Sequence, residues 1–447
     1  MTKVAFISLG CSKNLVDTEV MLHNLYKDGF EITFEPEEAE IIIVNTCGFI
    51  ESAKKEAIDN ILDAAELKQW GKCRHIIATG CLVERYREEV MNELPEIDGM
   101  VGVGSLEDIG EACRAVMRGE RYSSFKDKNT SPLGGGRILT TAPHTAYLKI
   151  AEGCDNRCTY CAIPLIRGKL RSRTIEDIVH EAKELDRAGV KELNLIAQDT
   201  SRYGLDLYGE YKLAELVREI TSNTSIPWIR LLYCYPDKIT DELIEEFKTN
   251  PRLVKYMDIP TQHIADSVLK RMNRHGGKQL IIDVIRKLRE RVPDITLRTT
   301  AMVGFPGETE EDFVELCEFI KQTRFDRFGA FTFSPEEDTE AALMPDQIDE
   351  QVKQDRMDIL MRSQMLINTA RNETRIGSVI TVLCEAYDPV NECYYGRSAE
   401  DAPDIDGKVF FRYNGEERIM PGSMVKVKVR EVVDYDVYGF ALKPENA

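Results

Sequence analysis

The sequence predicts an α/β protein built from three consecutive domains. Roughly the first 120 residues alternate short apolar strands with amphipathic stretches, and residues 144–370 repeat a strand-then-helix rhythm about six times. Residues 376–447 carry alternating apolar runs broken by Gly and Pro. The first two patterns are typical of parallel sheets with crossover helices, and the third of a small antiparallel β-barrel. We therefore expect domains at 1–122, 144–375 and 376–447, with a linker at 123–143.

In the N-terminal α/β domain, three apolar runs predict short buried strands, at 4–9, 41–44 and 76–78. Amphipathic stretches lie between them, and their apolar spacing predicts crossover helices. The segment that follows, 123–143, is rich in Ser, Gly and Pro and includes three consecutive glycines, Gly134 to Gly136. That composition is typical of a linker.

The second domain is predicted as an open, partial (βα)6 barrel, because six strand–helix units are too few for a closed eight-stranded barrel. The expected strands are at 146–150, 193–197, 229–233, 256–259, 296–303 and 328–333. Thr174 with Asp177, and Thr309 with Asp312, predict capped starts for two of the helices. An active site is expected at the carboxyl ends of the strands, by analogy with the full barrel.

Composition limits the classes of function. The chain has 447 residues, 43% of them apolar, and a net charge of −19, so bulk charge favours a basic partner over nucleic acid. No charged-then-apolar signal segment and no apolar run of about 18 residues is present, and we expect a cytoplasmic protein with no membrane contact. Twelve cysteines in such a chain indicate metal or redox chemistry rather than a disulfide framework.

Three of these cysteines form a compact C-x₃-C-x₂-C motif directly after the first strand of the second domain: Cys154, Cys158 and Cys161. Three thiolates at this spacing can hold one face of an iron–sulfur cubane and leave the fourth iron free to bind a substrate or cofactor. A zinc site or a cluster used only for electron transfer are the alternatives. The ligand count and the position after the first barrel strand argue against zinc.

A second set, Cys11, Cys47 and Cys81, lies in the N-terminal domain, and each cysteine follows one of the three predicted strands. Parallel strands end at the same edge of a sheet, so these cysteines can converge on one metal centre although they are far apart in sequence. The alternative is that they are small buried core residues. The remaining six cysteines show no such pattern, and we expect them to be structural: Cys73, Cys113, Cys234, Cys317, Cys384 and Cys393.

The spacing of Cys154, Cys158 and Cys161, with Tyr160 before the third cysteine, resembles the radical S-adenosylmethionine (SAM) superfamily. The resemblance implies that the open iron chelates SAM and that one electron cleaves it to a 5′-deoxyadenosyl radical. It also implies SAM contacts by Tyr160, and by segments after the second and fifth barrel strands that contain Gln198, Asp199, Gly304 and Gly307. For the Gly304–Gly307 segment alone, an ordinary tight turn is an equally good interpretation.

Across its length the chain resembles the methylthiotransferases, and among them the enzymes that modify ribosomal protein S12. The resemblance rests on the segments around Cys11 and Cys47, on the stretch 149–173, and on 397–403 in the third domain, which is similar to a TRAM domain. It implies two [4Fe–4S] clusters, SAM, a sulfur donor and an electron donor. The implied reaction is methylthiolation of the β-carbon of an aspartate in S12; no residue is assigned a further catalytic role.

Two alternatives to this function remain open. One is a tRNA methylthiotransferase acting on a modified adenosine, and the other is a non-catalytic iron–sulfur scaffold or electron carrier. Residues 376–447 hold eight Lys/Arg and thirteen Asp/Glu, and this acidic balance disfavours RNA. The basic strip Arg167, Lys169, Arg171 and Arg173 either attracts an acidic substrate side chain or is a solvated face.

Overall fold

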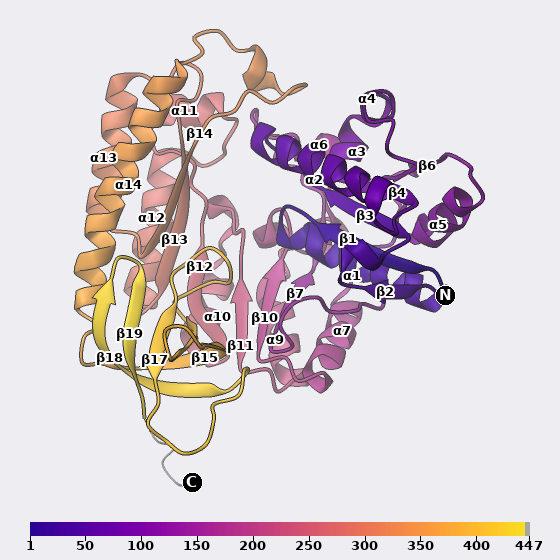
Figure 1. Cartoon of the computed structure of the whole chain (residues 1–447). Helices are drawn as coiled ribbons and strands as arrows, with labels where there is room; N and C mark the ends of the chain where they lie inside the picture. Colours follow the sequence, from indigo (N-terminus) through magenta and orange to yellow (C-terminus); the bar gives the residue numbers. More distant parts are fainter. Residues whose placement is uncertain (443–447) are drawn as a thin grey trace.

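Two six-stranded sheets and a closed five-stranded barrel form the protein in the computed structural model, which describes residues 1–442 (Figure 1). The predicted fold class is confirmed. The last five residues of the predicted third domain, 443–447, lie outside the described residues. Among the helices of residues 1–442, none combines the length and apolarity that a membrane span needs.

The N-terminal sheet is entirely parallel, in the order β2-β1-β3-β4-β5-β6. Apolar clusters pack on both of its faces, because its central strands are buried on both sides. The three predicted strands are present, and the three that the sequence did not predict are only three residues long. The strands are β1 Lys3–Ser8, β2 Glu31–Thr33, β3 Ile41–Thr46, β4 His75–Gly80, β5 Gly99–Val101 and β6 Tyr122–Ser124. The helices are α1 Ser12–Lys27, α2 Glu51–Trp70, α3 Cys81–Arg85, α4 Arg87–Glu93 and α5 Ile109–Met117, with 3₁₀ turns at Pro36–Glu38 and Leu106–Asp108.

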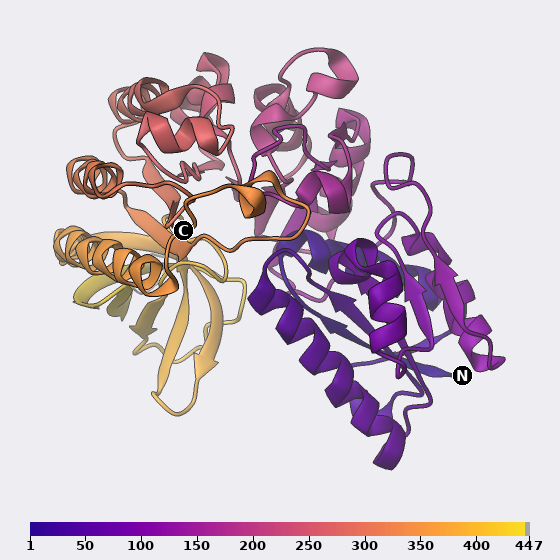
Figure 2. The same ribbon diagram turned by 90° about the horizontal axis from the view of Figure 1, so that it is seen from above.

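The second sheet is parallel and open, in the order β14-β13-β12-β11-β10-β7. All six predicted strands are found, and seen from above the strands and helices form an arc that faces the N-terminal domain (Figure 2). Its strands are β7 Thr145–Lys149, β10 Glu192–Ile196, β11 Trp228–Leu231, β12 Leu253–Asp258, β13 Thr296–Val303 and β14 Arg327–Thr332, and a short hairpin joins β8 Ala151–Glu152 to β9 Arg171–Ser172.

The longer helices of this domain cover the outer face of the sheet, whereas α6 lies at its carboxyl edge against α3; two of the helices begin at the predicted caps. The Thr174 side chain accepts a hydrogen bond from the Asp177 N–H, and Thr309 forms a full capping box with Asp312. The helices are α6 Ile163–Arg167, α7 Ile175–Arg187, α8 Leu205–Tyr208, α9 Leu213–Asn223, α10 Asp241–Thr249, α11 Asp266–Arg271, α12 Gly277–Arg291, α13 Glu310–Thr323 and α14 Glu350–Glu373, with 3₁₀ turns at Thr200–Arg202, Pro236–Lys238 and Glu340–Leu343.

The C-terminal barrel closes in the order β15-β16-β17-β19-β18. Its pairings are antiparallel except for β17 with β19, which run parallel. The strands are β15 Val379–Asp388, β16 Cys393–Ser398, β17 Val409–Arg412, β18 Met424–Val433 and β19 Asp436–Ala441. The barrel lies below the second sheet, at the amino ends of its strands (Figure 1). Its Arg397 pairs there with Glu192, the first residue of β10 (2.6 Å). The carboxyl ends of the strands are therefore left free for a site.

Candidate functional site

Cys11, Cys47 and Cys81 lie at the carboxyl ends of three neighbouring strands. Cys11 stands between β1 and α1, Cys47 directly follows β3, and Cys81 begins α3 directly after β4. Because β1, β3 and β4 are adjacent and parallel, the three turns open at one edge of the sheet.

Asn14 ties these three turns together, a role that no sequence pattern indicated. Its Nδ2 donates hydrogen bonds to the carbonyls of Leu9 (2.9 Å) and Thr46 (2.8 Å), just before Cys11 and Cys47. Its Oδ1 accepts a contact from Cys81 Sγ at 3.7 Å. A fully buried amide on the first turn of α1 therefore holds all three cysteine-bearing turns in register.

Two glycines allow the turns to approach so closely. Gly10 has φ +85°, and a Cβ there would lie 2.7 Å from the Cβ of Cys47. Gly80 has φ +92°, and a Cβ there would lie 2.4 Å from the Thr46 carbonyl oxygen. At both positions any side chain would force the cysteine turns apart.

The thiols of this set influence one another electrostatically. Burial raises the pKa of the Cys81 thiol to about 12, and the nearby Cys11 and Cys47 raise it further, against the effect of Arg167. Burial also raises the pKa of Cys47. At Cys11, desolvation by surrounding atoms raises the pKa, but Lys13 and Arg167 outweigh it and hold the pKa below its usual value. No three His, Cys, Asp or Glu side chains of residues 1–442 already stand at metal-ligand spacing. The donor set is nonetheless that of an iron–sulfur cluster, three thiols with an adjacent cation.

A buried ion network joins this edge to the second sheet. Arg167, at the end of α6, donates to Asp17 of α1 (2.5 Å), to Glu152 (3.2 Å) and to Asn14 Oδ1 (2.6 Å). Lys149 of β7 pairs with the same two carboxylates, at 2.5 Å and 2.7 Å. The carboxyl edges of the two parallel sheets therefore face each other across a network of two cations and two carboxylates.

Cys154, Cys158 and Cys161 occupy the loop between β8 and α6, at the carboxyl edge of the second sheet. The Cys161 N–H donates to the Cys158 carbonyl (3.0 Å), which curls the loop. Burial raises the pKa of Cys154 to about 12, and it also raises the pKa of Cys161, with Cys158 and Cys154 as contributing neighbours. The Cys158 Sγ lies 3.6 Å from the Tyr235 hydroxyl, which follows β11. The loop thus presents three half-exposed thiols to one space, a donor set that fits a cluster with one open iron.

The other predicted site residues surround this loop. The Tyr160 hydroxyl accepts a hydrogen bond from Arg274 (3.1 Å), and its ring meets Phe305 edge-on at 6.4 Å. Gln198 donates from Nε2 to Glu152 (2.5 Å). Asp199 is buried and accepts hydrogen bonds from Asn156 (2.7 Å) and Ser201. Burial raises the pKa of Asp199.

Gly304 and Gly307 lie in the turn after β13, and both have positive φ, +72° and +71°. The Gly304 N–H donates to Glu308 (2.8 Å), and the Gly307 N–H donates to the Asp346 carbonyl (2.9 Å). A Cβ at Gly304 would strike the Lys353 side chain, and one at Gly307 would strike Arg271. The turn therefore needs these glycines for its own packing, and their contact with SAM stays a prediction.

Three buried amide oxygens around the cysteine loop have no hydrogen-bond partner in the described part of the chain. They belong to Asn156, Gln198 and Gln262. Buried acceptors are rarely left unpaired, so these oxygens are available to hydrogen bonds from a polar ligand or from water. Gln198 was predicted from the sequence, whereas Asn156 and Gln262 were missed; Asn156 stands inside the cysteine motif.

A pocket of about 750 Å³ opens between the N-terminal domain and the second sheet. It is lined by residues after β3, including Phe49 and Ile50, by Tyr160 and Gln262, and by the segment 331–336 after β14. Its volume is in the range of small-molecule sites, and it reaches the cysteine loop through Tyr160. Residues of both the N-terminal domain and the second sheet contribute walls to it.

The basic strip after the cysteine loop does not form one surface. Arg167 and Arg173 are buried in ion pairs, the latter with Asp177 (2.7 Å) and Glu181 (2.6 Å). Arg171 donates to the Ser131 carbonyl, and Lys169 is exposed. Of the six cysteines expected to be structural, five are buried and Cys317 is half-buried.

Comparison with known families divides the chain in the same way as the fold. The model of the Radical SAM superfamily matches residues 148–320. A model described as Uncharacterized protein family UPF0004 matches residues 3–102, and a TRAM domain model matches residues 376–442.

Curated relatives match along nearly the whole chain. A ribosomal protein uS12 methylthiotransferase RimO from Clostridium tetani is 49% identical over 442 residues, covering 98% of each chain. The protein of the same name from Clostridium perfringens is 49% identical over 439 residues, covering 98% of this chain and 97% of the relative. Among solved structures, the radical SAM methyltransferase TsrM from Kitasatospora setae shares the fold at a TM-score of 0.55, with 14% identity over 74% of this chain and 73% of that one.

Proposed function

The chain belongs to the family of the ribosomal protein uS12 methylthiotransferases, and on that basis we propose that it methylthiolates the β-carbon of an aspartate in ribosomal protein S12. One observation carries the proposal beyond the family. Two three-cysteine sets lie at the facing edges of two parallel sheets, joined by Arg167. A single-cluster radical enzyme or an electron carrier has no need of that arrangement.

Cys154, Cys158 and Cys161 would hold one [4Fe–4S] cluster, and Cys11, Cys47 and Cys81 the other. When bound, the first cluster with SAM supplies a radical able to take hydrogen from an unactivated C–H bond, and the second supplies the sulfur that a further SAM methylates. No acid or base of ordinary pKa removes such a hydrogen. External donors of sulfur and of electrons are required.

The residues of the chain bind and orient these groups. We assign Tyr160, Gln198, Asp199, Gly304 and Gly307 to the SAM site. Gln198 has an unpaired buried oxygen there, and Asp199 fixes the amide of Asn156, which has another. The Phe49–Ile50 side of the pocket, together with Tyr160, supplies apolar walls beside the cysteine loop.

A protein substrate fits the charge of the molecule. The net charge is −19, and residues 376–442 carry seven Lys/Arg against twelve Asp/Glu. An acidic surface repels RNA phosphates and speeds encounter with a cationic ribosomal protein at low salt. A ribosomal-protein substrate also fits a cytoplasmic location.

The test is to incubate the anaerobically reconstituted chain, SAM and a reductant with S12 and, separately, with unmodified tRNA. We expect a mass gain of one methylthio group on S12, on an aspartate, together with 5′-deoxyadenosine and S-adenosylhomocysteine. Modification of tRNA with none of S12 would overturn the proposal and favour the tRNA enzyme. Cleavage of SAM without any methylthio product would also contradict it.

A further inference from the structure

Lys13 is a buried cation without a carboxylate partner in residues 1–442. The residue is 8% exposed, and its Nζ lies 3.5 Å from the centre of the Tyr233 ring. A cation–π contact stabilises an ammonium group, but it does not replace the hydrogen bonds that the group made with water. The Nζ group has three N–H donors and no salt bridge to a carboxylate within residues 1–442, so it is available to an anionic acceptor.

The neighbouring charges already balance one another. Lys149 and Arg167 face Asp17 and Glu152, two cations against two carboxylates, all of them buried. That network has no positive charge left for an incoming anion. The positive charge of Lys13, two residues after Cys11, is not balanced by a carboxylate and remains available to an incoming anion.

Lys13 also lies where the two cysteine sets meet. It belongs to the first turn of α1, whereas Tyr233, whose ring it covers, follows β11 of the second sheet. Two residues further on, the Tyr235 hydroxyl is 3.6 Å from Cys158 Sγ. One short segment after β11 thus touches Lys13 beside the first set and Cys158 of the second.

We propose that Lys13 Nζ binds the side-chain carboxylate of the target aspartate, with the Tyr233 ring fixing its position. This rests on the proposed function, and it names the group that selects the substrate side chain. The carboxylate carbon of aspartate is bonded directly to Cβ. Anchoring the carboxylate therefore places Cβ within one bond of a fixed point, between the two cysteine sets. In glutamate the same anchor would present Cγ instead.

A competing role for Lys13 is to balance the charge of the Cys11 set alone. Arg167 already contacts that set by donating to Cys81 at 3.4 Å, although its charge is shared with Asp17 and Glu152. The two roles differ in a measurable way. A counter-charge affects cluster retention irrespective of the substrate, whereas a carboxylate anchor affects discrimination between an acid and its amide.

The experiment compares S12 with S12 variants carrying Asn or Glu at the modified position. The dissociation constant is measured by anisotropy on the reconstituted chain without SAM or reductant, and kcat/KM is measured separately. A hydrogen-bonded charge pair predicts that the wild type binds the Asp form at least about tenfold more tightly than the Asn form. In Lys13→Gln the two forms should bind within about threefold of each other.

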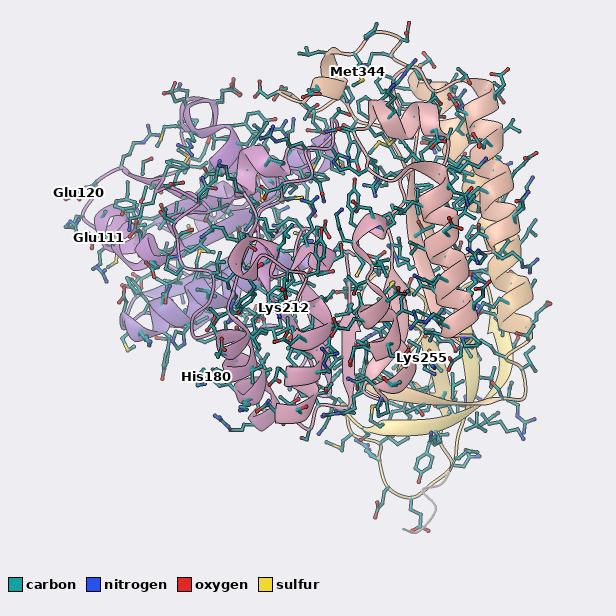
Figure 3. All side chains as sticks on the ribbon, turned by 180° about the vertical axis from the view of Figure 1, so that it is seen from behind. Glu111, Glu120, His180, Lys212, Lys255 and Met344 are labelled. Carbon is teal, nitrogen blue, oxygen red and sulfur yellow. The ribbon has the colours of Figure 1, made fainter. Side chains whose placement is uncertain are left out.

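Lys255→Gln is the matched control. Lys255 lies on the second sheet, away from the N-terminal domain (Figure 3), and pairs with Asp294 at 2.8 Å. This variant should keep the wild-type preference for Asp over Asn. Tyr233→Leu, which removes the ring but keeps the charge, should weaken the preference part of the way, and it serves as the test if Lys13→Gln does not fold.

Equal binding of the Asp and Asn forms by the wild type would overturn the inference. An unchanged preference for the Asp form in Lys13→Gln would also overturn it. If Lys13→Gln does not fold, an unchanged preference in Tyr233→Leu has the same meaning. Loss of iron in Lys13→Gln with the preference intact would assign Lys13 to the counter-charge role. Failure of the wild type to modify S12 at all is a different result, because it removes the proposed function as well. Wild type that modifies S12 but binds the Asp and Asn forms equally contradicts only the role of Lys13, whereas wild type that does not modify S12 contradicts the proposed function.

Discussion

Arg167 donates a hydrogen bond from Nη2 to Cys81 Sγ at 3.4 Å, from the second domain to a cysteine of the first. The same guanidinium pairs with Asp17 and Glu152. One side chain thus connects a cysteine set to the ion network between the sheets. Together with Lys149, which also pairs with Asp17, it holds the two sets in their relative position.

Replacing Arg167 with Met should therefore destabilise the chain by about 3–5 kcal/mol, because it leaves two buried carboxylates facing Lys149 alone. The measurement is urea unfolding of the anaerobic protein, together with its iron content. Adding Asp17→Asn to this variant should restore part of the stability, since it removes the unpaired carboxylate. Arg118→Met, at an exposed ion pair, should leave the free energy of unfolding close to that of the wild type.

The two cysteine sets should load independently. Replacing Cys154, Cys158 and Cys161 with Ala should remove about half of the reconstituted iron and abolish SAM cleavage. Replacing Cys11, Cys47 and Cys81 should also remove about half of the iron and abolish sulfur insertion, while some 5′-deoxyadenosine is still formed. Iron analysis and product chromatography check both. Complete loss of iron from either triple variant would contradict independent sites.

The C-terminal barrel should stabilise the second domain from below. Arg397 pairs with Glu192, which also accepts from Arg230 (2.9 Å), and all three side chains are buried. Arg397→Met should cost about 3–5 kcal/mol, because a buried carboxylate loses one of its two cations. Arg412→Met, on the exposed surface of the same barrel, is the control for urea unfolding. Equal stability of the two variants would show that the barrel does not support the sheet.

The strands, and the position of each set's cysteines after a strand, could be predicted because an apolar run is a local signal. An apolar run predicts a buried strand, and parallel strands share an edge, so Cys11, Cys47 and Cys81 could be placed together without the structure. Short strands such as β2 and β5 were missed because three residues carry no periodicity.

The partners of charged residues could not be predicted, because they come from distant segments. Arg167 stands in a run of basic residues that suggested one strip, yet it pairs with Asp17, 150 residues away in sequence. From the sequence, Asn14 is likewise an ordinary polar residue on an amphipathic helix. Only the fold shows that its side-chain amide contacts three turns. Tertiary structure alone separates these side chains from ordinary solvated ones.

Glu308 and His263 form a buried pair beside the predicted SAM turn, with Glu308 Oε2 and His263 Nε2 3.7 Å apart. Burial raises the pKa of Glu308 from 4.5 to about 7, although Arg356 and the N–H groups of Gly304 and Phe305 oppose the shift. Burial lowers the pKa of His263 from 6.5 to about 4, with Asp312 and Arg356 acting on it in opposite senses. Between these values both side chains are neutral in the folded chain.

The two groups should affect stability with opposite signs. The raised pKa of Glu308 gives a contribution that is fully present below about pH 4.5 and is lost as the pH rises through about 7. The lowered pKa of His263 gives a contribution that is present above about pH 6.5 and is lost as the pH falls through about 4. Each pKa shift corresponds to about 3 kcal/mol in the free energy of unfolding. Because the two contributions change in opposite directions with pH, they should nearly cancel, and this pair should add little pH dependence to the stability of the wild type.

Replacing one of the two residues should make the pH dependence contributed by the other measurable. Relative to the wild type, Glu308→Gln should gain up to about 3 kcal/mol as the pH rises from 5 to 7.5, because its amide cannot ionise. His263→Gln should gain stability in the opposite direction, as the pH falls over the same range. Urea unfolding at several pH values measures both differences, and Glu310→Gln, an exposed neighbour, should follow the wild type. Parallel profiles for Glu308→Gln and the wild type would mean that Glu308 is ionised throughout, and that Arg356 rather than burial sets its charge.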